Sequence, residues 1–171
     1  SLVGSEMCIR DRKERITGVD LADKLLRRAG EQGKSVYLLG AKEEVVSALA
    51  QKLKAQYPQM EVRYKNGYSK DKDADFREIE AFQPDLVLVA LGVPAQEKLI
   101  ARHLENFSKG VFIGVGGSFD VLSGSKRRAP ALFVKTNTEW LYRILREPSR
   151  LGRFYRNNIK FLGEVRKEAK G

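Results

Sequence analysis

The chain has 171 residues and a mass of 19.3 kDa, with 42% apolar and 9% aromatic side chains, enough for one hydrophobic core and too many for wholesale disorder. A helix that crosses a bilayer needs about 18 apolar residues in a row, and no apolar run in this sequence is that long. The first residues also lack the apolar segment of a secretory signal, so neither a membrane-spanning helix nor a signal peptide is expected. A single cysteine, Cys8, excludes an internal disulfide, and a single histidine, His103, leaves little material for a zinc site. Cytosolic residence is the default expectation.

The positive charge is concentrated in the last quarter of the sequence. Residues 125–171 hold 13 Lys and Arg against four Glu, a formal charge of +9, whereas residues 1–124 carry 19 basic and 18 acidic side chains. This asymmetry predicts a nearly neutral body with a cationic appendage for polyanions such as phosphates, nucleic acid or anionic lipid.

The first twelve residues, SLVGSEMCIRDR, show neither a helical nor a strand period. They resemble a translated sequencing-adapter peptide, so residues 1–12 are expected to be non-native and are left out of the fold. The native pattern then starts near Lys13, and we expect the protein's own N-terminus to be missing.

Helical and strand patterns alternate from Lys13 onward. In chain order, the predicted elements are a helix capped at Thr17 or Asp20 that buries Leu21, Leu25, Leu26 and Ala29 and closes at Gly30 and Gly33; a strand at 35–40; a helical stripe from Val45 to Leu53; a strand at 61–64; a helical face at Phe76, Ile79 and Phe82; a strand at 85–92; a helix from Pro94 through Leu104; and a strand at 111–117. The continuous apolar run at 85–92 is typical of a parallel strand buried on both faces. Together they predict an α/β fold, a Rossmann-like parallel sheet flanked by helices.

Glycines and polar side chains follow two of these strands. Gln96 lies just after the third strand, and the turn GVGGS, residues 114–118, ends the fourth. Parallel sheets bind ligands beyond the carboxyl ends of their strands, where glycine lets a phosphate approach the backbone. Local turn structure is the alternative for each residue taken alone. Phe119 stands where a dinucleotide-binding G-x-G-x-x-G motif needs its third glycine, which disfavours a Rossmann-type nucleotide-cofactor enzyme.

Six short sequence segments, taken in their order along the chain, resemble a known protein family more specifically than the glycine-rich turn does alone. They are ERITGVDL (14–21), VYLLGA (36–41), LVALGVPAQEK (88–98), GVGGSFDVLSG (114–124), KRRAP (126–130) and EWLYRILREPSR (139–150). In sequence and spacing they resemble the WecG/TagA/CpsF family, glycosyltransferase family 26, over about residues 13–165. The resemblance implies an inverting, UDP-sugar-dependent hexosyltransferase that moves an N-acetylmannosamine-type sugar onto an undecaprenyl-diphosphate-linked acceptor. Such enzymes act on the inner face of the bacterial cell membrane, in the synthesis of teichoic acid linkage units or other cell-surface polysaccharides.

The resemblance also implies where the substrates bind. Its expected binding residues are Arg15, Thr17, Gln96, Gly116, Gly117 and Ser118 for the donor, and Arg143, Arg150 and Arg153 for the diphosphate of UDP or of the lipid. An arginine suits this role because its planar fork pairs with phosphate oxygens. No metal and no cofactor other than the UDP-sugar itself is expected.

The catalytic residue stays unassigned. Family members carry a proposed general base, an aspartate, upstream of the ER-x-x-G segment, and nothing before Glu14 matches it, since Asp11 lies in the adapter-like peptide. We therefore expect this chain to be inactive or nearly so. Loss of a first βα unit would also expose apolar sheet surface, which favours a homo-oligomer.

Residues 13–137 are thus expected to form the glycosyltransferase core, and residues 138–171 a basic amphipathic helical appendage that docks on an anionic membrane. A surface helix packed on the body is the alternative for this segment, and nucleic-acid binding is the rival function, although no nucleic-acid-binding motif is recognised. DKDAD at 71–75 contains the Asp-x-Asp spacing of some metal sites, but a helix start is the better interpretation. His103 is expected to be a half-buried structural side chain.

Overall fold

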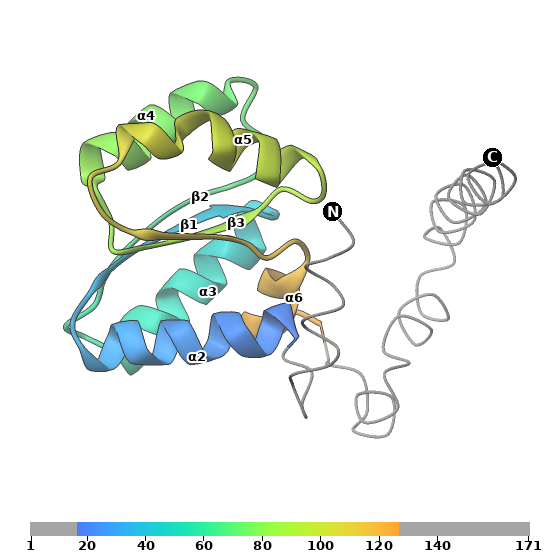
Figure 1. Ribbon diagram of the computed structural model, residues 1–171. Coiled ribbons are helices and arrows are strands. Elements are labelled where there is room, and N and C mark those ends of the chain that lie inside the picture. The colour runs from blue at the N-terminus through green and yellow to red at the C-terminus, as the bar shows by residue number, and fades with distance from the viewer. Residues whose placement is uncertain (1–16, 127–171) are drawn as a thin grey trace, which may run out of the picture. The chain divides into compact units, whose positions relative to one another are not determined.

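The computed structural model describes residues 17–126, which lie in one compact unit of the chain. Its four strands are β1 (Ser35–Gly40), β2 (Glu61–Lys65), β3 (Leu86–Ala90) and β4 (Val111–Gly114), all parallel and ordered β2-β1-β3-β4. Its helices are α2 (Gly18–Glu31), α3 (Glu43–Gln56), α4 (Lys72–Phe82), α5 (Ala95–His103), the 3-10 turn η1 (Leu104–Asn106) and α6 (Ser118–Leu122). The predicted Rossmann-like parallel sheet flanked by helices is confirmed for these residues (Figure 1).

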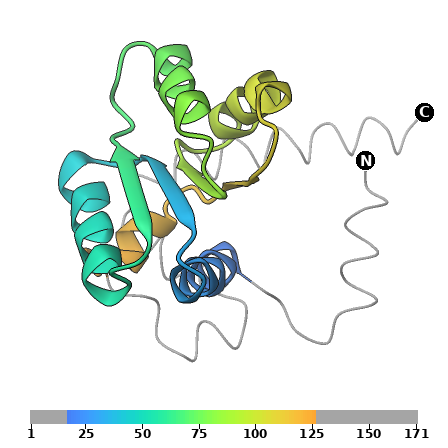
Figure 2. The same ribbon diagram turned by 90° about the vertical axis from the view of Figure 1, so that its left-hand side faces the viewer.

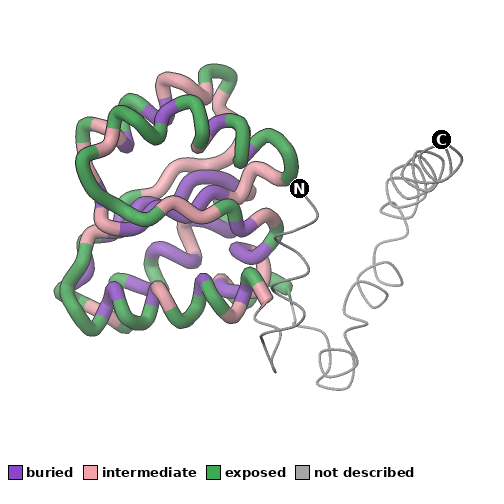
Figure 3. The backbone as a smooth tube through the Cα atoms, in the orientation of Figure 1, coloured by how far each residue is buried: buried purple, intermediate pink, exposed green. Residues whose placement is uncertain are grey.

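The sheet is the middle of three layers. Helices α2, α3 and α6 cover one face and α4 and α5 the other, as Figure 1 and the turned view in Figure 2 show. Successive residues of β1 alternate between the layers, since Val36 and Leu38 join the core beneath α2 and α3, and Tyr37 and Leu39 join the core beneath α4 and α5. The residues of the two central strands, β1 and β3, are therefore mostly buried (Figure 3). The continuous apolar runs of β1 and β3 follow from burial on both faces.

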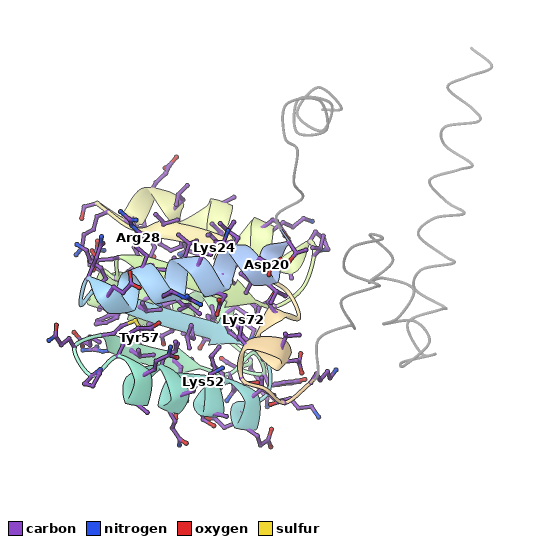
Figure 4. The ribbon with its side chains drawn as sticks, turned by 90° about the horizontal axis from the view of Figure 1, so that it is seen from below. Asp20, Lys24, Arg28, Lys52, Tyr57 and Lys72 are labelled. Carbon is purple, nitrogen blue, oxygen red and sulfur yellow. The ribbon has the colours of Figure 1, made fainter. Side chains whose placement is uncertain are left out.

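Helix α2 begins where the sequence places its cap. Thr17 is the N-cap residue and its hydroxyl accepts a hydrogen bond from the Asp20 N–H at 3.3 Å. The prediction that Leu21 is buried is wrong, because this side chain is 39% exposed. Leu26 and Ala29 are buried as predicted, and the other buried residues of the helix are Val19, Ala22 and Gly30. Figure 4 shows Asp20, Lys24 and Arg28 following one another along the same helix.

Three predicted elements extend beyond the observed ones, and the first is the strand predicted at 85–92, which is observed as Leu86–Ala90. Helix α5 ends at His103 and continues only as η1, so Leu104 is 48% exposed rather than part of the buried stripe. Strand β4 ends at Gly114 instead of reaching residue 117. The Val115 N–H still donates to the Val89 carbonyl oxygen at 2.8 Å, but Gly116 then adopts a φ of +50° and turns the chain toward α6. Pro94 is the N-cap residue of α5 and lies just before its first turn.

The acidic run at 71–75 is a helix start, as expected. Asp71 caps α4 by accepting a hydrogen bond from the Ala74 N–H at 2.9 Å. Asp73 Oδ1 lies 2.8 Å from His103 Nε2, and hydrogen bonds with His103 and then Arg102 hold the pKa of the Asp73 carboxyl below its usual value. Asp75 is buried and ion-paired with Lys65 at 3.2 Å. These carboxylates cap α4 and fasten it to β2 and α5.

At the amino edge of the sheet, Asp85 joins β1 to β3. Its carboxylate accepts hydrogen bonds from the Ser35 N–H at 3.0 Å and the Ser35 hydroxyl at 2.8 Å. These bonds, more than the ion pair with Lys109, lower the pKa of Asp85 from 3.8 to about 2. The carboxylate thus stabilises the fold above pH 4, and this contribution is lost as the pH falls toward 2.

Candidate functional site

The connections of the sheet diverge at the carboxyl ends of β1 and β3. The two strands are neighbours, yet β1 leads to α3 on one face and β3 leads to α5 on the opposite face (Figure 1). Open parallel sheets bind ligands in the crevice that such a divergence creates. The candidate site is therefore the carboxyl edge, which we define as the loops that follow the four strands together with the strand and helix ends that adjoin them, residues 40–42, 66–71, 91–96 and 115–118.

Backbone hydrogen bonds tie the loop after β1 to the end of β3 and to the loop after β2. The Ala41 N–H donates to the Ala90 carbonyl oxygen at 3.2 Å, and the Ala41 carbonyl oxygen accepts from the Gly67 N–H at 2.8 Å. Gly40 precedes this junction with a φ of +124°, and a Cβ there would lie 2.6 Å from the carbonyl carbon of Ala90. Only glycine permits this close approach of β1 and β3 at the point of divergence.

Gln96 braces the loops after β3 and β4. Its side chain is buried, and its Oε1 accepts hydrogen bonds from the Gly92 N–H and the Gly116 N–H, each at 3.1 Å. Its Nε2 donates to Glu97 Oε1 at 2.8 Å. The structure therefore brings Gln96 to the predicted edge, with its amide engaged by protein groups. Here it acts by positioning the two glycine loops.

The glycine-rich turn is likewise internally bonded. The Ser118 side chain is buried, and its hydroxyl donates to the Val115 carbonyl oxygen at 2.6 Å. Gly117 is the N-cap residue of α6 and is exposed, whereas the N–H of Gly116 is the one held by Gln96. Of this predicted group, Gly117 is the member whose exposure leaves it accessible to a ligand.

Of the remaining predicted binding residues, only Thr17, at the start of α2, is among the described residues. Thr17 donates its hydroxyl hydrogen to Asp20 Oδ2 at 2.6 Å, in addition to capping the helix. The four arginines of the prediction lie outside the described residues, as does the predicted domain boundary at 137. They are Arg15, Arg143, Arg150 and Arg153.

A cleft of about 370 Å³ opens beside the carboxyl edge. Its lining comes from the start of α3, from the loop after β2, and from α6 and the residues after it; the residues are Ala41, Lys42, Val45, Tyr68, Asp120, Ser125 and Lys126. Volumes of this order accommodate a nucleotide-sized ligand. We name this cavity the α3–α6 cleft.

No residue that lines the cleft is among the predicted binding residues, and Tyr68 and Lys42 are two of those missed. Tyr68 is 71% exposed, and its N–H donates to Asn66 Oδ1 at 2.9 Å, which fixes the backbone beside the ring. Lys42 is the N-cap residue of α3 and makes no side-chain capping hydrogen bond. A sequence signal was present for both, since each follows a predicted strand of a parallel sheet within a few residues.

Among residues 17–126, no helix is both long and apolar enough to cross a membrane. The same stretch contains no cluster of three or more His, Cys, Asp or Glu side chains arranged to hold a metal ion.

Comparison with known proteins finds the same family that the sequence motifs resemble. The family model for the "Glycosyl transferase WecG/TagA/CpsF family" matches residues 2–171, a longer range than the quoted motifs span. The chain is 40% identical over 139 residues to the N-acetylglucosaminyldiphosphoundecaprenol N-acetyl-beta-D-mannosaminyltransferase of Bacillus subtilis (strain 168), covering 81% of this chain and 54% of that protein. It is 41% identical over 140 residues to the protein of the same name from Staphylococcus aureus (strain MW2), covering 81% of this chain and 55% of that protein. The chain spans about half the length of the curated relatives it matches, and it belongs to the WecG/TagA/CpsF family of glycosyltransferases.

Proposed function

We propose that this chain supplies the donor-binding part of an inverting glycosyltransferase. The reaction moves an N-acetylmannosamine-type sugar from UDP to an undecaprenyl-diphosphate-linked acceptor, in the synthesis of a teichoic acid linkage unit or a related cell-surface polysaccharide. The observation that carries the proposal is the 40% identity over 81% of the chain to a transferase whose name specifies that sugar and that lipid-linked acceptor.

The geometry of the carboxyl edge supports a nucleotide-sugar donor. A cleft of about 370 Å³ with two lysines lies beside the point where the connections of the sheet diverge. In an inverting transfer, the acceptor hydroxyl attacks the anomeric carbon while the bond from that carbon to the UDP oxygen breaks. Negative charge then grows on the departing diphosphate, and cations nearby lower the barrier by stabilising it.

The chemistry also requires a base that takes the proton of the acceptor hydroxyl. We assign no such base among residues 17–126, and the catalytic residue stays unassigned. The proposal retains Arg15 for the donor diphosphate and Arg143, Arg150 and Arg153 for the diphosphate of UDP or of the lipid. It also retains peripheral attachment of the basic segment to the inner membrane face, and it includes no metal.

The first prediction concerns thermal stability. We expect saturating UDP or UDP-N-acetylmannosamine to raise the melting temperature of the full chain by about 5 °C, because a ligand at 100 times its Kd stabilises the folded state by about 2.7 kcal/mol. NAD and S-adenosylmethionine, measured in parallel by differential scanning fluorimetry, are expected to shift it by less than about 1 °C at the same concentration. A rise with NAD or S-adenosylmethionine and none with the uridine ligands would contradict the proposal and favour a Rossmann-type cofactor enzyme.

A further inference from the structure

We propose that His103 is a positioning residue for donor binding: its ring, as the charged imidazolium, fastens α5 to α4, and α5 in turn places Gln96 between the glycine loops. This inference rests on the proposed function and gives a part in it to a side chain outside the carboxyl edge.

The ring of His103 lies between two carboxylates of α4. Its Nε2 is 2.8 Å from Asp73 Oδ1, and its Nδ1 is 3.0 Å from Glu80 Oε1. An ionised carboxylate can only accept hydrogen bonds, so a ring nitrogen that bonds to one must carry a hydrogen. Neutral imidazole has one N–H and the imidazolium has two. Both contacts are therefore hydrogen bonds at the same time only when the ring is charged, an arrangement that we call the histidine bridge.

Both carboxylates are ionised at neutral pH. Hydrogen bonds with His103 and then Arg102 hold the pKa of the Asp73 carboxyl below its ordinary value of 3.8. A hydrogen bond from Asn106 Nδ2, at 2.7 Å, and then the one with His103 hold the pKa of Glu80 below its ordinary value of 4.5. The histidine bridge therefore keeps both acceptors above pH 4.5 and loses them as the pH falls through the lowered pKa values.

The ring is also packed away from water. Helices α4 and α5 lie side by side on one face of the sheet (Figure 1), and His103 between them is 8% exposed. Its ring is stacked on the Phe76 ring of α4, with centroids 4.9 Å apart and an interplanar angle of 25°. A cation over an aromatic face is stabilised, and its contacts with carboxylates are stronger where water is excluded.

Two arginines act on the same carboxylates from outside. Arg102 Nη1 lies 2.9 Å from Asp73 Oδ1, and Arg77 contributes to the lowered pKa of Glu80. Both arginine side chains are 63% exposed, whereas the His103 side chain is 11% exposed. Exposed ion pairs contribute little to stability because water and salt screen them. The histidine bridge is therefore the charged contact that fixes α5 on α4.

Helix α5 connects the histidine bridge to the candidate site. Its buried residues are Gln96, Leu99 and His103, which follow one another at helical spacing on one face. Only Leu99 is apolar, so the placement of the helix depends on the polar contacts at both ends. Gln96 holds the Gly92 and Gly116 N–H groups, each at 3.1 Å. A looser contact at His103 therefore loosens the hold on both glycine loops.

The first measurement is the charge state of the ring by NMR. His103 is the only histidine of the chain, so after removal of any affinity tag it gives the only imidazole signals. A long-range proton–nitrogen correlation spectrum at about pH 7 is expected to show two ring nitrogens with nearly equal shifts, as in imidazolium. A neutral ring, with one nitrogen far downfield of the other, would overturn the histidine bridge.

The second measurement is the affinity for UDP-N-acetylmannosamine by titration calorimetry, over the pH range in which the ring titrates. The diphosphate of this ligand is esterified at both ends, so its charge is constant over that range. With rising pH the affinity is expected to fall about threefold, with the same midpoint as the ring signals. His103→Gln keeps an amide donor but no charge, and it is expected to bind about threefold more weakly than the charged wild type and without this pH dependence.

Arg27→Ala is the matched control. It removes an arginine from α2 whose pair with Asp23, at 3.5 Å, joins side chains that are 64% and 56% exposed. This variant is expected to bind the UDP-sugar as the wild type does, with the same pH profile. His103→Gln is expected to melt about 4 °C below the wild type, since a hydrogen bond to a buried charged group is lost. The pH profile of the wild type tests the inference even if His103→Gln does not fold.

The possible results separate the inference from the proposed function. If the ring titrates while the affinity of the wild type stays constant, the positioning role is overturned and the proposed function stands. The same conclusion follows if His103→Gln keeps the pH profile of the wild type. If the wild type binds no UDP-sugar at any pH, the proposed function fails and the positioning role fails with it.

Discussion

Gly40→Ala is expected to destabilise the chain by about 3 kcal/mol, a large fraction of the free energy of unfolding of a domain of this size. The wild-type backbone at this position has a φ of +124°, which an alanine adopts only at a cost. The new methyl group would also lie 2.6 Å from the carbonyl carbon of Ala90, and backbone atoms of a central strand cannot move aside without disturbing β3. The backbone strain and the steric overlap of the new methyl group therefore both lower the free energy of unfolding.

The measurement is urea unfolding followed by circular dichroism, with Gly33→Ala as the matched control. Gly33 also has a positive φ, +59°, but lies at the opposite edge of the sheet, and a Cβ there would meet its nearest neighbour, the Gln59 carbonyl oxygen, at an ordinary 3.5 Å. Its substitution is expected to cost only the conformational penalty, about 1 kcal/mol. Equal stability of the two variants would show that β1 and β3 do not approach each other as described.

Gln96→Ala is expected to lower the free energy of unfolding by about 2 kcal/mol and to weaken UDP binding by more than tenfold. The variant removes the oxygen that accepts from the Gly92 N–H and the Gly116 N–H, so two partly buried donors lose their partner at once. The loops after β3 and β4 are then no longer held to each other. We expect the site to lose its geometry even though Gln96 reaches the ligand only through these loops.

Gln83→Ala is the control, because Gln83 braces loops at the other edge of the sheet. Its Oε1 accepts from the Ser108 hydroxyl at 3.1 Å, and its Nε2 donates to the Glu80 carbonyl oxygen at 2.9 Å. A similar loss of stability with unchanged UDP affinity is expected for Gln83→Ala. If titration calorimetry shows the same UDP affinity for both variants, Gln96 has no positioning role in the site.

The helices and strands of this fold were predictable from the sequence because the two patterns that indicate them, continuous apolar runs and helical periodicity, are local. The run at 85–92 is continuously apolar, and the stripe from Val45 to Leu53 has a helical period, so β3 and α3 were identified without knowledge of their neighbours. The buried face of α2 was misplaced at Leu21 because the sequence contains apolar residues on both sides of the true face. Packing against α6 and β1 selects between them.

The site was less predictable because it depends on residues far apart in the sequence. Lys42, Tyr68 and Lys126 meet at one cleft only after all four strands have been placed in the order β2-β1-β3-β4. The inward turn of Gln96 depends in the same way on Gly114, where a Cβ would lie 2.9 Å from the Gln96 amide carbon. No local pattern near residue 96 reveals that space, so a resemblance that placed Gln96 near the donor left its orientation open.

The location of the nucleotide can be measured by titrating the isotopically labelled full chain with UDP and following its backbone amide resonances by NMR. We expect the largest shifts at residues 41–42, 67–68, 116–118 and 125–126, which surround the carboxyl edge and the α3–α6 cleft. Residues 33–35, 83–85 and 108–111, at the opposite edge of the sheet, are expected to remain unchanged. Shifts concentrated at that opposite edge, or none at a UDP concentration that raises the melting temperature, would contradict a donor site at the carboxyl ends of the strands.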